Sequence, residues 1–214
     1  MSRSTAVFLA ALGSLLLAVV LGACGSSGGS AGRSTSAAGK DGKVSYAAPS
    51  VATPPKAAAP LQLRNSLGQR VDLRSYRGKA VLVTFIYTHC PDVCPLIVGN
   101  LHNAQANLGA KAKDLRIVAV STDPRGDTPK TVARFLRQHD MTGRMQYLLG
   151  SRRQLGRVWK AWNIVARPEK ADPELVEHSA LIYGISGSGN VTTLYPANFK
   201  PAWIVHDVPL LATH

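Results

Sequence analysis

Cys90 and Cys94 are the residues whose type and spacing most directly indicate chemistry. They stand four positions apart beside Pro91 and Pro95, after the apolar run Ala80–Tyr87 and before an expected helix. Peptide dipoles at a helix N-terminus favour anions and lower the pKa of a thiol. Two thiols at this spacing can face the same way and either form a disulfide or bind a soft metal ion. A purely structural disulfide is the alternative, although a bridge that closes so short a loop stabilises a fold little.

Two thiolates alone under-coordinate a metal ion, so a third ligand is expected among the six histidines. His178 follows a polar, proline-marked loop and precedes the apolar run Ala180–Ile185, which places it at a strand edge. His89 adjoins Cys90, but a loop can need a polar residue there for its own sake. The remaining histidines are expected on the surface: His102, His139, His206 and His214. The pattern therefore singles out His178 as the strongest candidate among the six histidines, although a lone histidine at a strand edge is more often an ordinary structural residue.

The elements around these residues predict an α/β domain. The continuous β-branched and aromatic run Ala80–Tyr87 is typical of a strand buried on both faces, and Asp114–Ser121 is expected to be a second buried strand. Helices are expected over about 96–108, 128–139 and 152–162, and shorter strands over 61–63, 71–73, 147–149, 180–185 and 191–195. The tail, 199–211, is expected to be helical in part, with Pro209 as an interruption. This order predicts a thioredoxin-like mixed sheet flanked by helices, with an N-terminal β-hairpin extension and a site at the C-terminal ends of the strands.

The N-terminal 23 residues are typical of an export signal. Arg3 is the only charge before position 33, an apolar stretch runs from Ala6 to Val20, and small residues precede Cys24. The run from Leu21 to Cys24 resembles a bacterial lipobox, which implies cleavage before Cys24 and attachment of lipid to it. An uncleaved signal anchor is the alternative, for which the apolar segment is short.

The next region, 24–60, is predicted to be a flexible tether. Of the 36 residues from Gly25 to Pro60, 26 are Gly, Ser, Ala or Pro, which offers too little large apolar surface for a core. Residues 61–214 are then expected to form one folded domain. Three cysteines exclude a disulfide-dense scaffold, and a single apolar run near spanning length excludes a multi-pass membrane protein.

The chain is strongly basic, with a net charge of +13 at pH 7. Such a charge can indicate nucleic-acid binding, but an exported protein meets no genome, so an anionic lipid or an acidic protein is the expected partner. Between Arg125 and Lys170 there are 11 Lys and Arg residues against 3 acidic ones. A solvated helical surface explains this excess equally simply.

Residues 87–95, with the sequence Tyr-Thr-His-Cys-Pro-Asp-Val-Cys-Pro, resemble the signature of the Sco/SenC copper-chaperone family. Residues 121–129 resemble its Asp-Pro-x-x-Asp-Thr segment, and residues 177–179, followed by Tyr183, resemble its Asp-His-Ser motif and strand tyrosine. The resemblance spans about Leu61 to Tyr195. Three features depart from the family pattern: Glu177 in place of Asp, Gly126 where Arg is common, and Ser188-Gly189-Asn190 in place of an Asp-Gly turn.

The resemblance implies a thioredoxin-like domain, lipid-anchored at the outer face of the cell membrane, that binds one copper ion through Cys90, Cys94 and His178. It implies assistance in assembling the binuclear copper centre of cytochrome c oxidase. The implied partners are oxidase subunit II, a thiol reductant and a copper donor, and not nucleic acid. Thiolates select Cu(I), and imidazole also suits copper. For Cu(II), a water molecule or a nearby carboxylate, Asp92 or Glu177, can add a further ligand to the two thiolates and the imidazole.

Two further carboxylates, Asp123 and Asp127, are expected to shape the loop and cap the following helix rather than bind metal. Docking of Arg152, Arg153 and Arg157 onto an acidic face of subunit II is the corresponding hypothesis for the basic surface.

Two other activities fit the same fold. A thiol–disulfide oxidoreductase that reduces the cysteines of the oxidase copper site needs Cys90 and Cys94 but not His178. A peroxidase-like protein would want a Thr-x-x-Cys motif, whereas Thr88 stands only two residues before Cys90. His178 therefore discriminates best between copper binding and dithiol chemistry.

Overall fold

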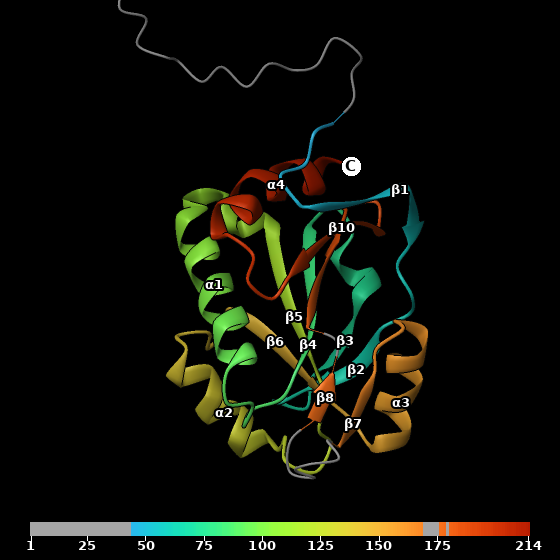
Figure 1. The fold of residues 1–214 in the computed structure, drawn as a ribbon, viewed down its shortest axis with the longest axis vertical. Helices are drawn as coiled ribbons and strands as arrows, with labels where there is room; N and C mark the ends of the chain where they lie inside the picture. Colours follow the sequence, from blue (N-terminus) through green and yellow to red (C-terminus); the bar gives the residue numbers. More distant parts are fainter. Residues whose placement is uncertain (1–43, 169–175, 179) are drawn as a thin grey trace, which may run out of the picture. The chain divides into compact units, whose positions relative to one another are not determined.

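The computed structural model describes residues 44–168, 176–178 and 180–214. Within them, eight strands form one mixed sheet in the order β1-β10-β9-β4-β5-β6-β2-β3 (Figure 1). The strands of this sheet are β1 (Ser50–Ala57), β2 (Gln62–Asn65), β3 (Arg70–Asp72), β4 (Ala80–Ile86), β5 (Leu115–Ser121), β6 (Met145–Leu149), β9 (Leu181–Ile185) and β10 (Asn190–Pro196). Strands β4, β5 and β6 run parallel at the centre, and the neighbours on both sides pair antiparallel.

Four α-helices and two 3₁₀ helices connect these strands in the described part of the chain. They are η1 (Leu73–Tyr76), α1 (Val93–Asn107), η2 (Gly109–Asp114), α2 (Pro129–Gln138), α3 (Arg152–Ala161) and α4 (Pro201–Thr213). A separate pair, β7 (Ala166–Pro168) and β8 (Val176–His178), is antiparallel. The predicted thioredoxin-like mixed sheet and the N-terminal β2–β3 hairpin are confirmed.

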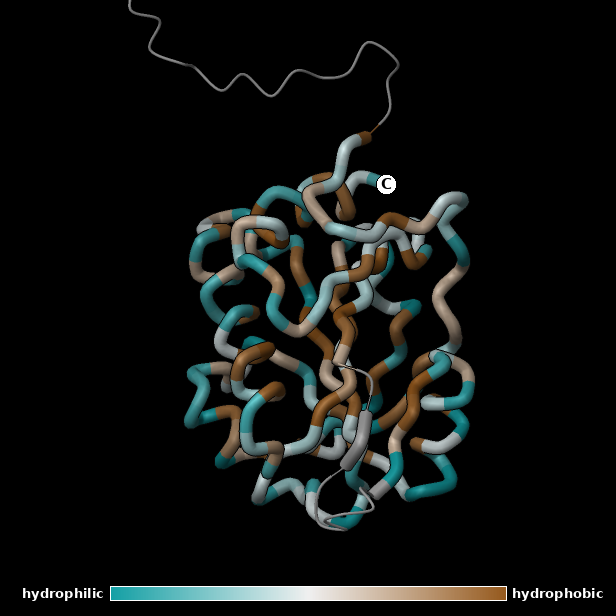
Figure 2. The backbone as a smooth tube through the Cα atoms, in the orientation of Figure 1, coloured by the Kyte–Doolittle hydropathy of each residue, from teal (hydrophilic) through white to brown (hydrophobic). Residues whose placement is uncertain are grey.

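The alternation of side chains along β4 divides the core into two layers. Leu82 and Ile86 pack with the buried faces of α1, α2 and α4. Val81, Val83 and Phe85 point to the opposite side of the sheet, where α3 and the β2–β3 hairpin cover them. The central strands are accordingly the most hydrophobic part of the trace in Figure 2. Because β4 is buried on both faces, its carboxyl end is a rigid point from which a loop can start.

The predicted tether is too long at its C-terminal end. Ser50–Ala57 is not a tether but the edge strand β1, paired antiparallel with β10. Its side chains are almost all exposed, so it contributes backbone hydrogen bonds rather than core. A composition poor in large apolar residues excludes a core but does not exclude an edge strand. The proposed signal segment, Cys24 and the tether up to residue 43 lie outside the described residues.

The C-terminal tail forms a longer helix than predicted, because α4 runs through Pro209. Ile204 and Val208 before the proline and Leu211 after it are all buried against the sheet, and this packing outweighs the lost backbone hydrogen bond. Strand β4 ends one residue before its predicted end, and α1 begins three residues before its predicted start and ends one residue before its predicted end. None of the helices in the described ranges is long and apolar enough to cross a membrane.

Candidate metal centre

The cysteine loop connects the carboxyl end of β4 to the first turn of α1. The helix begins at Val93, and the Asp92 side chain caps it by accepting the Val93 N–H. Cys90 in the loop and Cys94 in the helix are both buried. The backbone N–H of Cys94 donates to Sγ of Cys90 at 3.4 Å. The predicted convergence of the two cysteines at a strand end is therefore observed.

The pKa of the Cys94 thiol is raised, chiefly by burial, and further by the hydrogen bond with Cys90 and by the charge of Cys90. Sequence reasoning predicted the opposite direction from the helix N-terminus. That prediction is wrong for Cys94, because loss of water around a buried thiol outweighs the partial charge of the helix end. A soft cation between the two sulfurs would supply the positive charge that favours the thiolate forms.

A buried carboxylate, Asp127, fixes the start of the cysteine loop through hydrogen bonds. Its Oδ1 accepts the backbone N–H of Thr88 at 2.8 Å, and its Oδ2 accepts the hydroxyls of Ser121 at 2.6 Å and Tyr147 at 2.8 Å. Burial raises the pKa of Asp127, and the hydrogen bonds from Ser121, Thr88 and Tyr147 oppose that rise. Both oxygens of Asp127 are thus used in fixing the loop, as the sequence predicted for a loop-shaping residue.

Asp123 shapes the next loop and reaches the cysteine motif through His89. Its oxygens accept the backbone N–H groups of Arg125 and Gly126 at 3.0 and 2.9 Å. Nε2 of His89 lies 3.4 Å from Oδ2 of Asp123. A Cβ at Gly126 would stand 2.3 Å from that oxygen and 2.4 Å from Cε1 of His89. The departure at Gly126 therefore makes room for the imidazole beside the cysteines.

The helix cap is supplied by neither aspartate. Thr128 caps α2: its side chain accepts the Thr131 N–H, and the Thr131 hydroxyl in turn accepts the Thr128 N–H. The expectation that Asp123 or Asp127 caps the helix is wrong, since their oxygens are used within the loop and by the cysteine segment. Pro129 at the first helical position agrees with the sequence prediction.

His178 is the last residue of β8, where it pairs with Ala166 of β7. The side chains of His178 and Glu177 lie outside the described residues, so the predicted ligand set remains a prediction. Among the side chains that are described, no group of three or more His, Cys, Asp or Glu is placed to hold a metal ion. Asp92 is exposed and caps α1, and the described contacts give it no further role.

Tyr147 is the one residue at this site that sequence reasoning missed. It was assigned only to a short apolar strand, yet its hydroxyl also lies 3.2 Å from the carbonyl oxygen of Ile86. A tyrosine within a buried strand needs a polar partner for its hydroxyl, and this requirement was the available signal.

A buried pair of cysteines between the central strand of a thioredoxin-like sheet and the following helix defines the class of thioredoxin-like thiol or metal-binding domains. Residues 50–212 match the SCO1/SenC family model. The chain belongs to the SCO1/SenC family.

Two curated relatives illustrate the match. The SCO1 protein homolog of Bacillus subtilis is 30% identical over 142 residues, which cover 64% of this chain and 72% of the relative. The mitochondrial SCO1 homolog of Homo sapiens is 26% identical over 165 residues, which cover 75% of this chain and 53% of the relative. The chain thus spans about half the length of the human relative.

Solved structures agree with the fold. The structure of Bradyrhizobium japonicum ScoI with copper bound has a TM-score of 0.64 at 28% identity, covering 72% of this chain and 99% of that one. The structure of Arabidopsis thaliana ScoI with copper bound has a TM-score of 0.61 at 26% identity, and the match covers 69% of this chain and 92% of that one. BsSco is described as a member of the Sco family of cytochrome c oxidase assembly proteins with an identified disulfide switch. The BsSco structure has a TM-score of 0.62 at 26% identity, and the match covers 74% of this chain and 95% of that one.

Proposed function

We propose that this protein is a copper-binding metallochaperone that assists assembly of the binuclear copper centre of cytochrome c oxidase. The observation that carries the proposal is the buried pair of Cys90 and Cys94, linked by a 3.4 Å hydrogen bond from the Cys94 N–H to Sγ of Cys90. Relatives of this chain are described as copper-bound or as oxidase assembly proteins. Soft thiolates and an imidazole suit copper, and three-coordination leaves a side open for transfer.

His178 is proposed as the third ligand. Strand β9 pairs antiparallel with β4, with Thr84 opposite Ile182. Strand β9 therefore begins beside the carboxyl end of β4, and His178 stands three residues before Leu181, the first residue of β9. This topology supports a histidine at the same end of the sheet as the thiols.

The first test is a titration of the reduced, oxygen-free full chain with Cu(I) and with Cu(II). One equivalent is expected to bind, with a sulfur-to-copper charge-transfer band for Cu(II). Cys90→Ser and Cys94→Ser should abolish binding, and His178→Ala should weaken the band. His139→Ala is the matched control and should leave binding unchanged. Full stoichiometry and an unaltered band in His178→Ala would remove His178 from the ligand set.

Thiol–disulfide exchange is the second candidate function, favoured by the hydrogen bonding between the two thiols and by the disulfide switch described for BsSco. A disulfide between Cys90 and Cys94 cannot bind copper, so a thiol reductant is a required partner of the first function and a substrate of the second. Reduction of an oxidised peptide carrying the copper-site cysteines of oxidase subunit II distinguishes them. Loss of that reduction in Cys90→Ser but not in His178→Ala would favour the reductase.

We also propose lipid anchoring of the chain through Cys24 at the outer face of the cell membrane. The lipobox-like run and the preceding apolar stretch support this location. Fractionation and mass spectrometry of the exported protein should detect a lipid-modified N-terminal cysteine. Cys24→Ser should release the protein from the membrane fraction, and retention of this variant would contradict the anchor.

Oxidase subunit II is the proposed receiving partner. The excess of basic residues on α3 supports an acidic docking face on the partner. Reversing the charges of Arg152, Arg153 and Arg157 together should slow copper transfer and flatten its salt dependence. Transfer rates that do not change would contradict this docking.

A further inference from the structure

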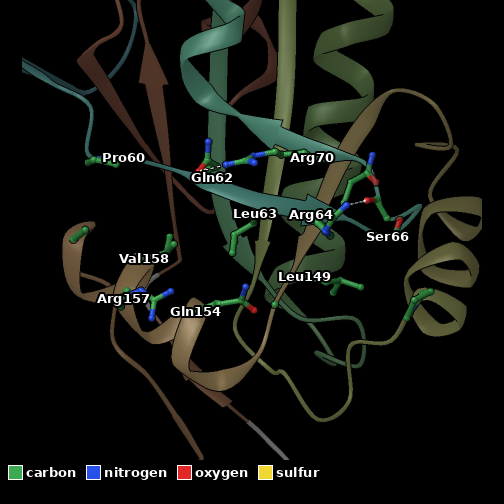
Figure 3. Close-up of a pocket in the computed structure, with 15 residues that line it drawn as sticks. Pro60, Gln62, Leu63, Arg64, Ser66, Arg70, Leu149, Gln154, Arg157 and Val158 are labelled. Atoms are coloured by element: carbon green, nitrogen blue, oxygen red, sulfur yellow. Dashed lines mark hydrogen bonds between the residues drawn. The ribbon is translucent and has the colours of Figure 1, made fainter.

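An open groove of about 750 Å³ lies between the β2–β3 hairpin and α3 (Figure 3). Leu63 of β2, Val158 of α3 and Leu149 at the carboxyl end of β6 contribute apolar atoms to the lining, together with Gly150, which follows β6. A Cβ on Gly150 would come within 3.2 Å of the Leu63 side chain, so the absence of a side chain there lets β2 and the segment after β6 pack closely beneath the groove. The lining residues include neither cysteine of the thiol site.

Three arginines line this groove, and the same lining includes no Asp or Glu. Arg64 and Arg70 come from the hairpin and Arg157 from α3, and all three are exposed. In the part of the chain that the structure describes, none of them forms a salt bridge. Like charges gathered in one concavity repel each other, and an anion placed among them would relieve that repulsion.

The two hairpin arginines are held in place by neutral groups. Nη1 of Arg64 donates to the carbonyl oxygen of Gly68 at 2.6 Å, and Nη2 of Arg70 donates to Oε1 of Gln62 at 2.8 Å. A guanidinium has five N–H donors, so each arginine keeps further donors for a ligand. The cost of ordering these side chains on binding is correspondingly reduced.

A second hollow continues the basic surface towards the thiol site. It measures about 480 Å³ and is lined by Pro124, Arg125, Ser151 and Arg152. Ser151 directly follows Gly150 of the groove, and Arg125 lies in the loop that Asp123 holds beside His89. Positive side chains therefore extend from the hairpin, past the N-terminal end of α3, to the loop next to the cysteine motif.

We propose that this groove binds an extended, acidic segment of a protein partner. Carboxylates of the segment pair with Arg64, Arg70 and Arg157. Its apolar side chains contact the small exposed edges of Leu63 and Val158, which are otherwise buried. Helix α3 has 10 residues, so it is about 15 Å long, which matches four or five residues of extended peptide at roughly 3.3 Å each. A concave site with apolar walls suits a peptide better than the flat surface of a bilayer. The inference requires no metal, and it rests on the proposed function to the extent that Arg157 also belongs to the basic surface proposed to dock oxidase subunit II.

The test is an NMR titration of the isotope-labelled, metal-free full chain with the capped hexapeptide Glu-Leu-Glu-Glu-Leu-Glu. Shifts are expected at the amides of the groove residues. Arg157→Glu should weaken binding about tenfold, because hydrogen bonds to charged groups are among the strong ones. Arg157→Lys should weaken binding less, because a lysine keeps the charge but loses the forked geometry.

Arg144→Glu is the matched control, because this substitution makes the same change in net charge. Arg144 is exposed and immediately precedes β6, at the end of the strand opposite to Leu149. Equal weakening by Arg144→Glu would overturn the proposal in favour of general charge attraction. Displacement of the peptide by inorganic phosphate or by phosphatidylglycerol vesicles, at equal charge concentration, would overturn it in favour of a small anion or a lipid surface. Copper stoichiometry of Arg157→Glu, measured separately, should equal that of the unchanged chain, so that failure of the groove and failure of the metal site are distinguishable.

Discussion

Asp127 and Asp207 are two buried carboxylates that do similar work at opposite ends of the sheet. Asp127 binds a backbone N–H and the hydroxyl of Tyr147, and so fixes the cysteine loop. Asp207 of α4 accepts the backbone N–H groups of Ala47 and Ala48 at 2.6 and 2.9 Å, and the hydroxyl of Tyr195 at 2.9 Å. One carboxylate therefore holds the functional loop, and the other holds the segment that leads into the edge strand β1.

The two sites differ in their partners. The hydrogen-bond partners of Asp127 are a backbone amide and hydroxyls, whereas Asp207 also lies 2.7 Å from Nδ1 of the half-exposed His206. The sequence motif points to Asp127, but no motif points to Asp207. The comparison teaches that the same buried arrangement can serve chemistry at one end and chain attachment at the other.

Asp207→Ala should give the largest loss of stability, because it strands two backbone donors and the Tyr195 hydroxyl in a buried site. We expect the free energy of unfolding to fall by about 3 kcal/mol. Denaturant unfolding measures this loss. The reaction of Cys90 and Cys94 with a thiol reagent should stay slow under native conditions. Fast labelling of the thiols in folded Asp207→Ala would show that the two ends are not independent.

Asp127→Ala should reduce stability somewhat less, by about 2 kcal/mol, because it leaves one backbone donor unpaired rather than two, and the Tyr147 hydroxyl keeps the carbonyl oxygen of Ile86 as an acceptor. Its distinctive effect should be on the loop: thiol labelling of Cys90 should become faster than in the unchanged chain or in Asp207→Ala. Equal labelling rates in the two aspartate variants would contradict a role for Asp127 in holding the loop.

Gly126→Ala tests how tightly the site end is packed. The added Cβ would overlap Oδ2 of Asp123 and the ring of His89, so we expect a loss of about 1–2 kcal/mol and a moved His89 resonance. Gly99→Ala is the control within α1, where a Cβ has nothing within 4 Å. That variant should be more stable by about 0.5–1 kcal/mol. A fully tolerated Gly126→Ala would mean that His89 and Asp123 are free to move apart.

Asp72 is a partly exposed carboxylate that gives the smallest effect. Its hydrogen bond with Arg74 lowers the pKa of Asp72 from 3.8 to about 2. Because the pKa of Asp72 is lower in the folded chain than in the unfolded chain, its ionised carboxylate stabilises the fold at a pH above the unfolded-state pKa. This stabilisation is lost as the pH falls from about 4 towards 2. Asp72→Asn should therefore cost under about 1 kcal/mol at pH 7, after screening by water, and remove this part of the acid dependence. Unfolding curves at pH 7 and pH 3 measure both, and an unchanged acid dependence would refute the assignment.

Local patterns predicted the elements that position the cysteines. The run of β4 is apolar throughout, and proline and threonine mark the start of α2, so both elements are visible in the sequence. The edge strand β1 was missed because its stability comes from pairing with β10, which is more than a hundred residues away in the chain. Partners distant in the chain, such as Ala47 and Asp207, leave no local pattern.

The candidate site divides in the same way. The spacing of Cys90 and Cys94 predicted their convergence, and the Asp127 loop was assigned correctly as structural. The direction of the Cys94 pKa shift depends on how completely the core surrounds the thiol, which a helix N-terminus in the sequence does not reveal. The role of Tyr147 was not predicted for a similar reason, because the partner of its hydroxyl, Asp127, lies in a loop distant in the sequence.

The attachment of Ala47 and Ala48 to Asp207 also has a mechanical consequence. A pull on the N-terminal side of residue 44 would load these two hydrogen bonds first and the β1–β10 ladder next. The central strand β4 and the cysteine loop at its far end would bear none of that load until the edge strand had peeled away. A force applied to the chain before residue 44 therefore acts first on hydrogen bonds at the Asp207 end of the sheet. The geometry of the thiols at the other end is preserved while those bonds hold.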